Sequence, residues 1–455
     1  MELVRSSGTV EIFAACAMGL VLGTLALVSP IAAILAVAAV AYIWISLTHP
    51  VVLGYTVIAA ATFTSGMPRG RLLPLLIPNE AVLLLSFALA FPLVLLVYRY
   101  KIPKPILIGF STLIVGTVVI PFFSYYTRGT NLSTGAMMGL LAPIQFVLMF
   151  VIFFMLGRDE QVQRRLINFM LICAALVALV GLLQAFNVEF INTFLRQWYP
   201  SLHLARVGND VNRVTSVFGA WNTLGTFLMV SLLLCVALIS KAQTRVDYAR
   251  LLIVGALCSM CLLASGSFAG IGGLVAGIGI IKIFDRSGLK AILVGGLILI
   301  VISVIALQPI LAERLEWQYG GGESGLIPQT LLYRFKIWEE IFLPVVARHP
   351  LGAIYPTLQG VSWGYAESQY IGLHYRTGLF SLLAHLTWVT MTLVWLYPRL
   401  KRQDSMTGTP VMTVFTVLIL LSVMGLTNEV FTYSGVMDYL WILLALASST
   451  ATEVV

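Results

Sequence analysis

Apolar stretches long enough to cross a membrane recur along almost the whole 455-residue chain. A helix needs roughly 20 apolar residues to cross about 30 Å of hydrocarbon, and many of these stretches reach that length. The sequence is 59% hydrophobic and 10% charged, and its mean hydropathy is +0.97. A water-soluble protein cannot hide so much apolar surface, because too much of it would remain in contact with water. The pattern therefore predicts an all-α polytopic membrane protein.

Length and hydropathy indicate about 12 to 14 transmembrane helices. The expected spans are 11–29, 31–47, 51–66, 79–98, 105–123, 135–156, 166–186, 218–240, 250–264, 267–283, 291–309, 371–396, 409–427 and 434–450. The pair 250–264 and 267–283 forms a tight hairpin around Ser265, Gly266 and Ser267. All five cysteines lie within these spans, so we expect neither a disulfide nor a metal site.

Basic residues gather in one set of short loops, which the positive-inside rule makes cytoplasmic. Both termini are then cytoplasmic, and two longer segments face the other side. The predicted organisation is an N-terminal bundle (1–186), a first outer loop (187–217), central helices (218–307), a larger outer loop (308–370) and C-terminal helices (371–455). The net charge of +8 is compatible with these topology signals, and no nucleic-acid-binding module is present.

The outer face carries eleven basic residues, and only one of them is a lysine. They are Arg69, Arg71, Arg128, Arg196, Arg206, Arg213, Arg314, Arg334, Lys336, Arg348 and Arg376. Arginine is preferred where planar, bidentate contact with phosphate or carboxylate is needed. One interpretation is an anionic ligand such as a lipid phosphate or diphosphate. The other is that these arginines tie loops together through acids such as Glu189, Glu339 and Glu340.

Residues 333–346, YRFKIWEEIFLPVV, have the pattern of an amphipathic helix lying at the membrane interface. The expected apolar face is Phe335, Trp338, Phe342 and Val345. Pro344 is expected to end the helix, because proline has no N–H group. Arg334 and Trp338 are four residues apart and should share a face.

The stretch GYAESQYIGLHYRTG at 364–378 contains a carboxylate where the chain re-enters the membrane. If the span starts near Ala366, then Glu367, Tyr370 and His374 line one face. Glu367 could cap the helix and complement its dipole. Alternatively, it could be a general base facing the arginine-rich loops. The sequence leaves both interpretations open.

Several segments resemble the bacterial O-antigen polymerase and O-antigen ligase superfamily. RVTSVFGAWNTLG at 213–225 is similar to the Arg-then-Asn segment that opens one of its spans. The R-x3-W of Arg334 and Trp338, HPLG at 349–352 and ESQY…RTGLFSLL resemble its large periplasmic loop. The resemblance covers roughly residues 180–400 and rests more on motif order and topology than on any one motif.

The resemblance implies a metal-independent, GT-C type glycosyltransferase in the bacterial inner membrane, with no cofactor. Its donor would be an undecaprenyl-diphosphate-linked glycan, and a second glycan would be the acceptor at the periplasmic face. A chain-length regulator would be a further partner. Carried over to this chain, Arg213 and Arg334 hold the diphosphate, and Glu367 stands where ligases have a His. Arg206, Arg314, Arg376, Tyr370 and His374 complete the expected substrate-binding set.

Two departures from the superfamily pattern bear on the activity. Phe268, in ASGSFAG at 264–270, takes the place of an Arg in an S-R-G segment, so Arg206, Arg314 or Arg376 must substitute for it or the substrate differs. Glu367 in place of His favours a polymerase of O-antigen or exopolysaccharide repeat units, although His349 or His374 could supply an imidazole.

Three other functions remain open at this point. A ligase that transfers the lipid-linked glycan to lipid A core differs only in its acceptor. A flippase or other transporter usually places ionisable residues deep in the spans, whereas here charge gathers in the outer loops. A non-catalytic scaffold of a cell-envelope complex is the third.

Overall fold

The computed structural model describes residues 41–69, 76–96, 102–127, 134–199, 213–285, 328–348, 366–401 and 408–449, together with Gln308 and Ala312. Every regular element in these ranges is a helix. Five of the helices in these ranges are long and apolar enough to cross a membrane, by length and composition, and shorter apolar helices accompany them. The described part of the chain therefore has the character of a helical membrane protein.

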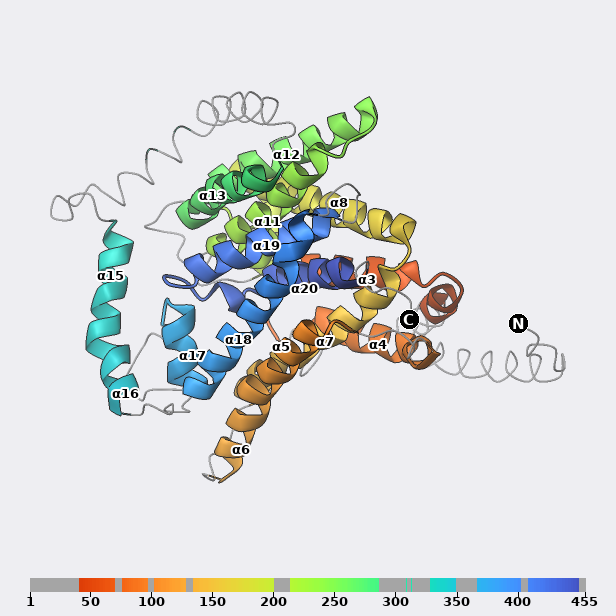
Figure 1. The fold of residues 1–455 in the computed structure, drawn as a ribbon. Coiled ribbons are helices and arrows are strands. Elements are labelled where there is room, and N and C mark those ends of the chain that lie inside the picture. The colour runs from red at the N-terminus through yellow and green to blue at the C-terminus, as the bar shows by residue number, and fades with distance from the viewer. Residues whose placement is uncertain are drawn as a thin grey trace, which may run out of the picture. The chain divides into compact units, whose positions relative to one another are not determined.

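The α-helices follow one another with short π- and 3-10 turns between some of them (Figure 1). They are α3 (Val51–Thr64), α4 (Pro78–Leu96), α5 (Lys104–Ile114), α6 (Ile120–Thr127), α7 (Thr134–Leu156), α8 (Glu160–Ala185), α9 (Glu189–Trp198), α11 (Trp221–Ile239), α12 (Arg245–Ser265), α13 (Phe268–Phe284), α15 (Gln329–Ile337), α16 (Leu343–Arg348), α17 (Gln369–Thr377), α18 (Leu379–Leu396), α19 (Gly408–Met424) and α20 (Ser434–Ser449). The π-turns are η1 (Val115–Val119) and η3 (Trp338–Phe342), and the 3-10 turns are η2 (Ser216–Phe218), η4 (Tyr397–Lys401) and η5 (Val430–Thr432).

The chain divides into two compact units, 1–53 and 54–455. Within the first unit, residues 41–48 are helical. The second unit contains the helical bundle and the candidate site.

Helices occupy the predicted apolar segments wherever the structure describes them, but the segment predicted as 371–396 is not one helix. It is split into α17 and α18 at Gly378. The φ of this residue is 93°, which glycine adopts readily and other residues adopt only with strain. The break separates a short polar helix from the apolar one that follows. The predicted spans 11–29 and 291–309 lie outside the described residues, except for Gln308.

Two helices form the centre of the bundle and are buried on all sides. In α11 every residue from 224 to 238 is buried, and in α20 every residue from 435 to 449 is buried. A helix that is apolar all round fits such a position, because it has no face to turn to water. The Tyr439 hydroxyl on α20 lies 3.0 Å from Thr62 Oγ1 and donates to the Met170 carbonyl over 3.0 Å. These bonds fasten α20 to α3 and α8.

The predicted hairpin between α12 and α13 is confirmed. Gly266 caps α12 with a φ of 61°, which glycine adopts without strain. Ser267 then caps α13, and its Oγ accepts the Gly270 N–H over 3.3 Å.

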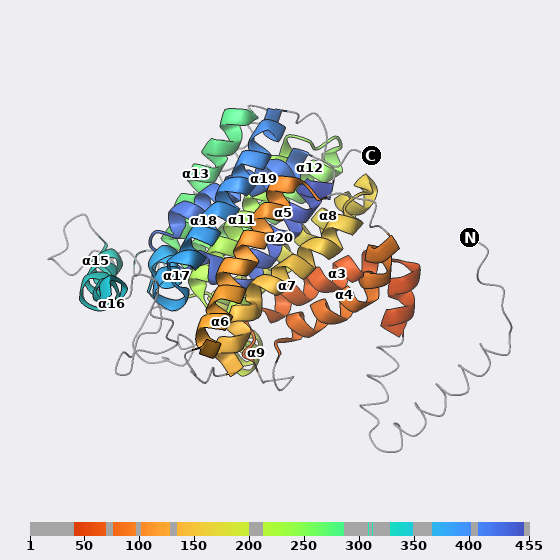
Figure 2. The same cartoon turned by 60° about the horizontal axis from the view of Figure 1, so that its bottom comes forward.

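Helix α18 packs closely along α5 and η1 (Figure 2). The Ser381 hydroxyl donates to the Gly116 carbonyl over 2.5 Å. Gly116 lies in the π-turn η1, where an added residue widens the helix, and its carbonyl points toward α18. Gly116 allows this approach because it has no side chain.

We expect Gly116→Ala to lower the thermal unfolding temperature of the purified protein. A Cβ at this position would clash with Ala384 Cβ and lie 3.1 Å from the Phe380 carbonyl oxygen. Overpacking of this kind costs about 1–3 kcal/mol. Gly272→Ala is the matched control, because a Cβ there meets nothing within 4 Å. Equal unfolding temperatures for the two variants would contradict the packing described here.

Candidate functional site

The predicted amphipathic helix is longer than expected and does not end at Pro344. It runs through α15, η3 and α16, from Gln329 to Arg348 (Figure 1). The π-turn immediately before the proline explains the difference. Leu343 donates its N–H to the Trp338 carbonyl, five residues back, so the hydrogen-bonding register has already shifted where Pro344 follows. A widened turn can accommodate a residue that has no N–H to donate.

The predicted apolar face is confirmed for Phe342, Trp338 and Val345, which pack in or against one cluster, but not for Phe335. Ile337 and Phe342 are buried and form an apolar cluster with Ala366 and Tyr375. The rings of Phe342 and Tyr375 meet edge to face, with centroids 5.2 Å apart. Phe335, expected on the apolar face, is 48% exposed. The extra residue of the π-turn rotates the apolar stripe, so simple helical spacing does not describe it.

Arg334 and Trp338 share a face, as predicted, and both contact the segment that leads into α17. Trp338 Nε1 donates to the Ala366 carbonyl over 2.6 Å. Arg334 donates to Glu367 Oε2 from Nη2 over 3.1 Å and from Nε over 3.3 Å. Two side chains from one turn of this helix thus bind the successive residues Ala366 and Glu367.

Glu367 precedes α17 and lies outside it. Ser368 occupies the N-cap position, and the Glu367 carboxylate is directed to Arg334. The interpretation of Glu367 as a helix cap is therefore wrong, as is the expectation that it lines a helix face with Tyr370 and His374. Glu367 also has a φ of 52°, a left-handed backbone conformation that is uncommon for residues other than Gly and Asn. Strain of this kind costs about 1–3 kcal/mol and persists only where surrounding contacts impose it.

The link between α19 and α20 supplies those contacts. Glu429 Oε1 accepts the Ala366 N–H over 2.8 Å. The Gln369 N–H donates to the carbonyls of Gly425, over 2.8 Å, and Asn428, over 3.1 Å. Residues on both sides of Glu367 are thus bonded to the α19–α20 link.

A second ion pair accompanies the first. Arg376, in the last turn of α17, pairs with Glu429, and its Nε also donates to the Gly372 carbonyl over 3.3 Å. Asn428 Oδ1 accepts from Arg334 Nη2 over 3.2 Å. We call Arg334, Glu367, Arg376 and Glu429 the ion-pair cluster. Its members come from three segments that are far apart in the sequence.

Burial affects the charges of the cluster unequally. The side chain of Glu429 is 4% exposed, whereas that of Glu367 is 25% exposed. Burial raises the pKa of Glu429, although the Arg376 guanidinium and the Ala366 N–H lower it and the Glu367 carboxylate raises it further. Glu429 is therefore the enclosed carboxylate, and Glu367 is the accessible one.

Two other predicted residues lie on α17. The Tyr370 hydroxyl donates to the Ser422 carbonyl over 2.6 Å, which ties α17 to α19. Burial also raises the pKa of Tyr370. His374 lies in the last turn of α17 with Arg376.

Arg213 lies at the entrance to α11, on a segment different from the three that form the ion-pair cluster. Its guanidinium carbon is 4.0 Å from the centre of the Trp221 ring, in cation–π contact. The following residues are fixed by Gln184, whose Oε1 accepts the N–H groups of Thr215 over 3.0 Å and Ser216 over 2.8 Å. Arg206, Arg314 and His349 lie outside the described residues.

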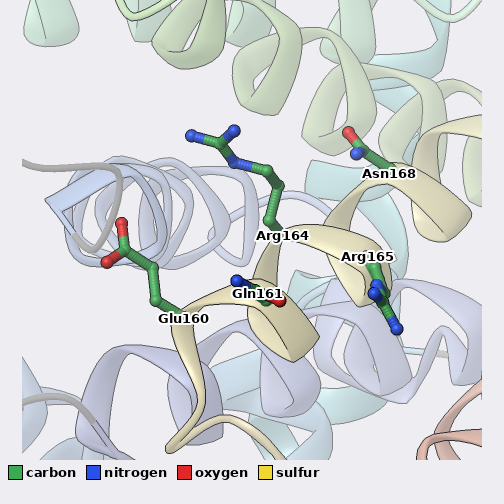
Figure 3. A pocket seen from close by; sticks show the side chains of 5 residues that line it. All are labelled: Glu160, Gln161, Arg164, Arg165 and Asn168. Carbon is green, nitrogen blue, oxygen red and sulfur yellow. The ribbon is translucent and has the colours of Figure 1, made fainter.

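A separate hollow lies at the start of α8, and Figure 3 shows its five lining side chains. They are Glu160, Gln161, Arg164, Arg165 and Asn168, all on one helix. Arg164 and Arg165 stand next to one of the short basic loops that the positive-inside rule predicts to be cytoplasmic, where insertion alone would account for positive charge.

Asn428 and Glu429 were not singled out from the sequence. A signal was present, because a carboxylate stands between two long apolar runs in GLTNEVFTYSG at 425–435. Its partner Arg376 lies 53 residues earlier in the chain, and spacing alone does not pair them. A search for relatives finds no match to any protein-family model or to any curated protein.

Glu429 should make the stability of the protein depend on pH. A carboxyl whose pKa is raised by folding favours the folded state when protonated. That contribution is complete below its ordinary value of 4.5 and is lost as pH rises through the raised pKa. We expect the thermal unfolding temperature to fall over this window in the wild type, and to fall less in Glu429→Gln, which is neutral throughout.

Glu340→Gln is the control for this measurement, because Glu340 is 60% exposed and, among the described residues, its ion-pair partner is Lys336 at 4.0 Å. Its pH profile should follow that of the wild type. An identical pH dependence in Glu429→Gln and the wild type would contradict the burial of this carboxylate.

Proposed function

We propose that the protein is a membrane-embedded glycosyltransferase that polymerises polysaccharide repeat units, O-antigen or exopolysaccharide, carried on undecaprenyl diphosphate. The observation that carries the proposal is the pairing of Arg334 with Glu367 at 3.1 Å. It combines an anion-binding group and an accessible carboxylate in a chain that is only 10% charged. Both residues belong to segments that resemble the O-antigen polymerase and ligase superfamily.

The proposed topology has about 14 spans, with both termini in the cytoplasm and the active site at the periplasmic face of the bacterial inner membrane. In this topology the 308–370 loop and the α19–α20 link lie on the same side. The bonds from Arg334 and Ala366 to Asn428 and Glu429 support that arrangement, since they join the loop to the link. In this proposal α17 carries Arg376 and Tyr370 on that side as well.

In the proposed reaction a sugar hydroxyl of the acceptor attacks the anomeric carbon of the donor. A new glycosidic C–O bond forms, and the bond from that carbon to the diphosphate oxygen breaks with inversion. The diphosphate leaves with the electron pair, and Glu367 takes the hydroxyl proton as general base. Both hydrogen bonds from Arg334 end on Oε2, so among the described residues Oε1 is the oxygen that is open to a substrate hydroxyl.

Arg334 stabilises the negative charge that develops on the leaving diphosphate. Its planar guanidinium has five N–H donors, so it can bind a phosphate oxygen and still contact Glu367. Arg213 is the second diphosphate ligand in this proposal. Arg206 and Arg314, from the two outer loops, and Arg376 are the further candidates for the position that Phe268 leaves without an arginine.

The test uses purified protein, a polyprenyl-diphosphate-linked repeat unit and a gel of the products, with EDTA present throughout. The wild type should give a ladder. Glu367→Gln should lose activity by at least about a hundredfold, the usual contribution of a general base, while Glu367→Asp keeps part of it. Arg334→Ala should be similarly impaired.

Glu340→Gln is the matched control, an exposed glutamate on the same loop helix, and should keep full activity. A ladder that persists in Glu367→Gln would remove Glu367 from the catalytic role. Product formed only when lipid A core is added would make the protein a ligase. Transport of the lipid-linked glycan without any glycosidic bond formation would contradict the proposal altogether.

A further inference from the structure

The backbone at Glu367 is held in its unusual conformation by two neighbouring residues of the α19–α20 link. We propose that Asn428 and Glu429 are positioning residues that fix the carboxylate of Glu367 against Arg334. The inference rests on the proposed function, in which Glu367 is the base. Neither residue needs to touch the substrate for this role.

Glu429 acts on the residue before Glu367. One of its oxygens accepts the Ala366 N–H over 2.8 Å, and the other pairs with Arg376. The ion pair with Arg376 fixes the orientation of the carboxylate, because a bridged carboxylate cannot rotate without breaking a bond. Glu429 is 5% exposed, so the bond to Ala366 is shielded from water. Trp338 holds the carbonyl of the same residue.

Asn428 acts on both partners of the proposed catalytic pair. Its Oδ1 accepts from Arg334 Nη2 over 3.2 Å, which orients the guanidinium. Its backbone carbonyl accepts the Gln369 N–H over 3.1 Å, two residues after Glu367. The link therefore holds Ala366 and Gln369, and the strained residue lies between them. Loss of these bonds would let Glu367 return to an ordinary φ and turn its carboxylate away.

Gly372 gives an independent way to disturb Glu429 without replacing it. A Cβ on Gly372 would lie 2.8 Å from Arg376 Nη2 and 3.0 Å from Glu429 Oε1. The closest atoms are the charged ends of the Arg376–Glu429 pair, so Gly372→Ala should push the pair apart. The variant is useful if Glu429→Ala fails to fold.

The first arm of the test is hydrogen–deuterium exchange, which does not depend on enzymatic activity. In the wild type the amides of Ala366 and Gln369, which are bonded to the link, should exchange slowly in peptides covering 366–369. Glu429→Ala and Gly372→Ala should each raise the exchange rate of the Ala366 amide by about tenfold, the effect of losing one buried hydrogen bond. Asn428→Ala removes a side-chain bond to Arg334 and keeps the backbone carbonyl that accepts the Gln369 N–H, so it should leave the exchange unchanged. Glu429→Gln should stay close to the wild type, because its amide oxygen can still accept the Ala366 N–H. Gly272→Ala and Glu340→Gln are controls and should not change the exchange.

The second arm measures the kinetics of the same variants on the lipid-linked substrate. Glu429→Ala, Gly372→Ala and Asn428→Ala should each lower kcat by about tenfold or more, because the base or its arginine partner is misplaced. Glu429→Gln should restore much of kcat. The low-pH limb of the kcat profile, set by ionisation of the base, should shift in Glu429→Ala and stay in place in the controls.

The two arms separate the inference from the proposed function. Unchanged exchange at 366–369 in both Glu429→Ala and Gly372→Ala overturns the positioning role, whatever the activity. Faster exchange with unaltered kcat and pH profile also overturns it, while the glycosyltransferase assignment stands. A wild type that is inactive on every donor and acceptor overturns the proposed function. The exchange data would then still show whether Glu429 holds the backbone at Ala366, but that contact would have no catalytic role.

Discussion

A carboxylate buried at the end of an apolar bundle has to be compensated, and the contacts that compensate Glu429 organise the candidate site. Moving an ionised carboxylate out of water is costly unless a cation and hydrogen-bond donors accompany it. Arg376 and the Ala366 N–H supply them. Arg376 is on α17 and Ala366 directly precedes it. The contacts that Glu429 needs therefore hold the end of the 308–370 loop and α17 against the α19–α20 link. Arg334 and Glu367 form the other ion pair of the same cluster, and Glu367 is the more accessible of the two carboxylates.

Departures from regular helix geometry make this arrangement possible. The π-turn at Trp338–Phe342 carries the loop helix past Pro344 and turns Ile337 and Phe342 inward. Gly378 separates the polar α17 from the apolar α18, so that Arg376 can turn toward Glu429. The absence of a side chain at Gly372 leaves room for that pair. These features sit where charge meets the bundle, which is where local irregularity tends to serve function.

The sequence was sufficient to predict the helical class, the positions of the described apolar helices and the hairpin at Gly266. Those features depend on local hydropathy and on turn residues, which act over short distances. The shared face of Arg334 and Trp338 was also predictable, because spacing of four holds within one turn of helix. Three predictions were wrong: the helix end at Pro344, the place of Phe335 on the apolar face, and the uninterrupted span 371–396. Each depends on a widened or broken turn. The contribution of Asn428 and Glu429 could not be predicted, because it is made by pairings 53 to 94 residues apart in the chain.

The central claim is that Arg334 and Glu367 act as one unit within a cluster that joins three segments of the chain. A double-mutant cycle on Arg334→Ala and Glu367→Ala, read by thermal unfolding of the purified protein, tests it most directly. Side chains in one ion-pair network show coupling free energies of about 0.5–3 kcal/mol, and those without contact add to within about 0.3–0.5 kcal/mol. We predict a coupling of about 1 kcal/mol. Additive effects of the two substitutions would contradict the account.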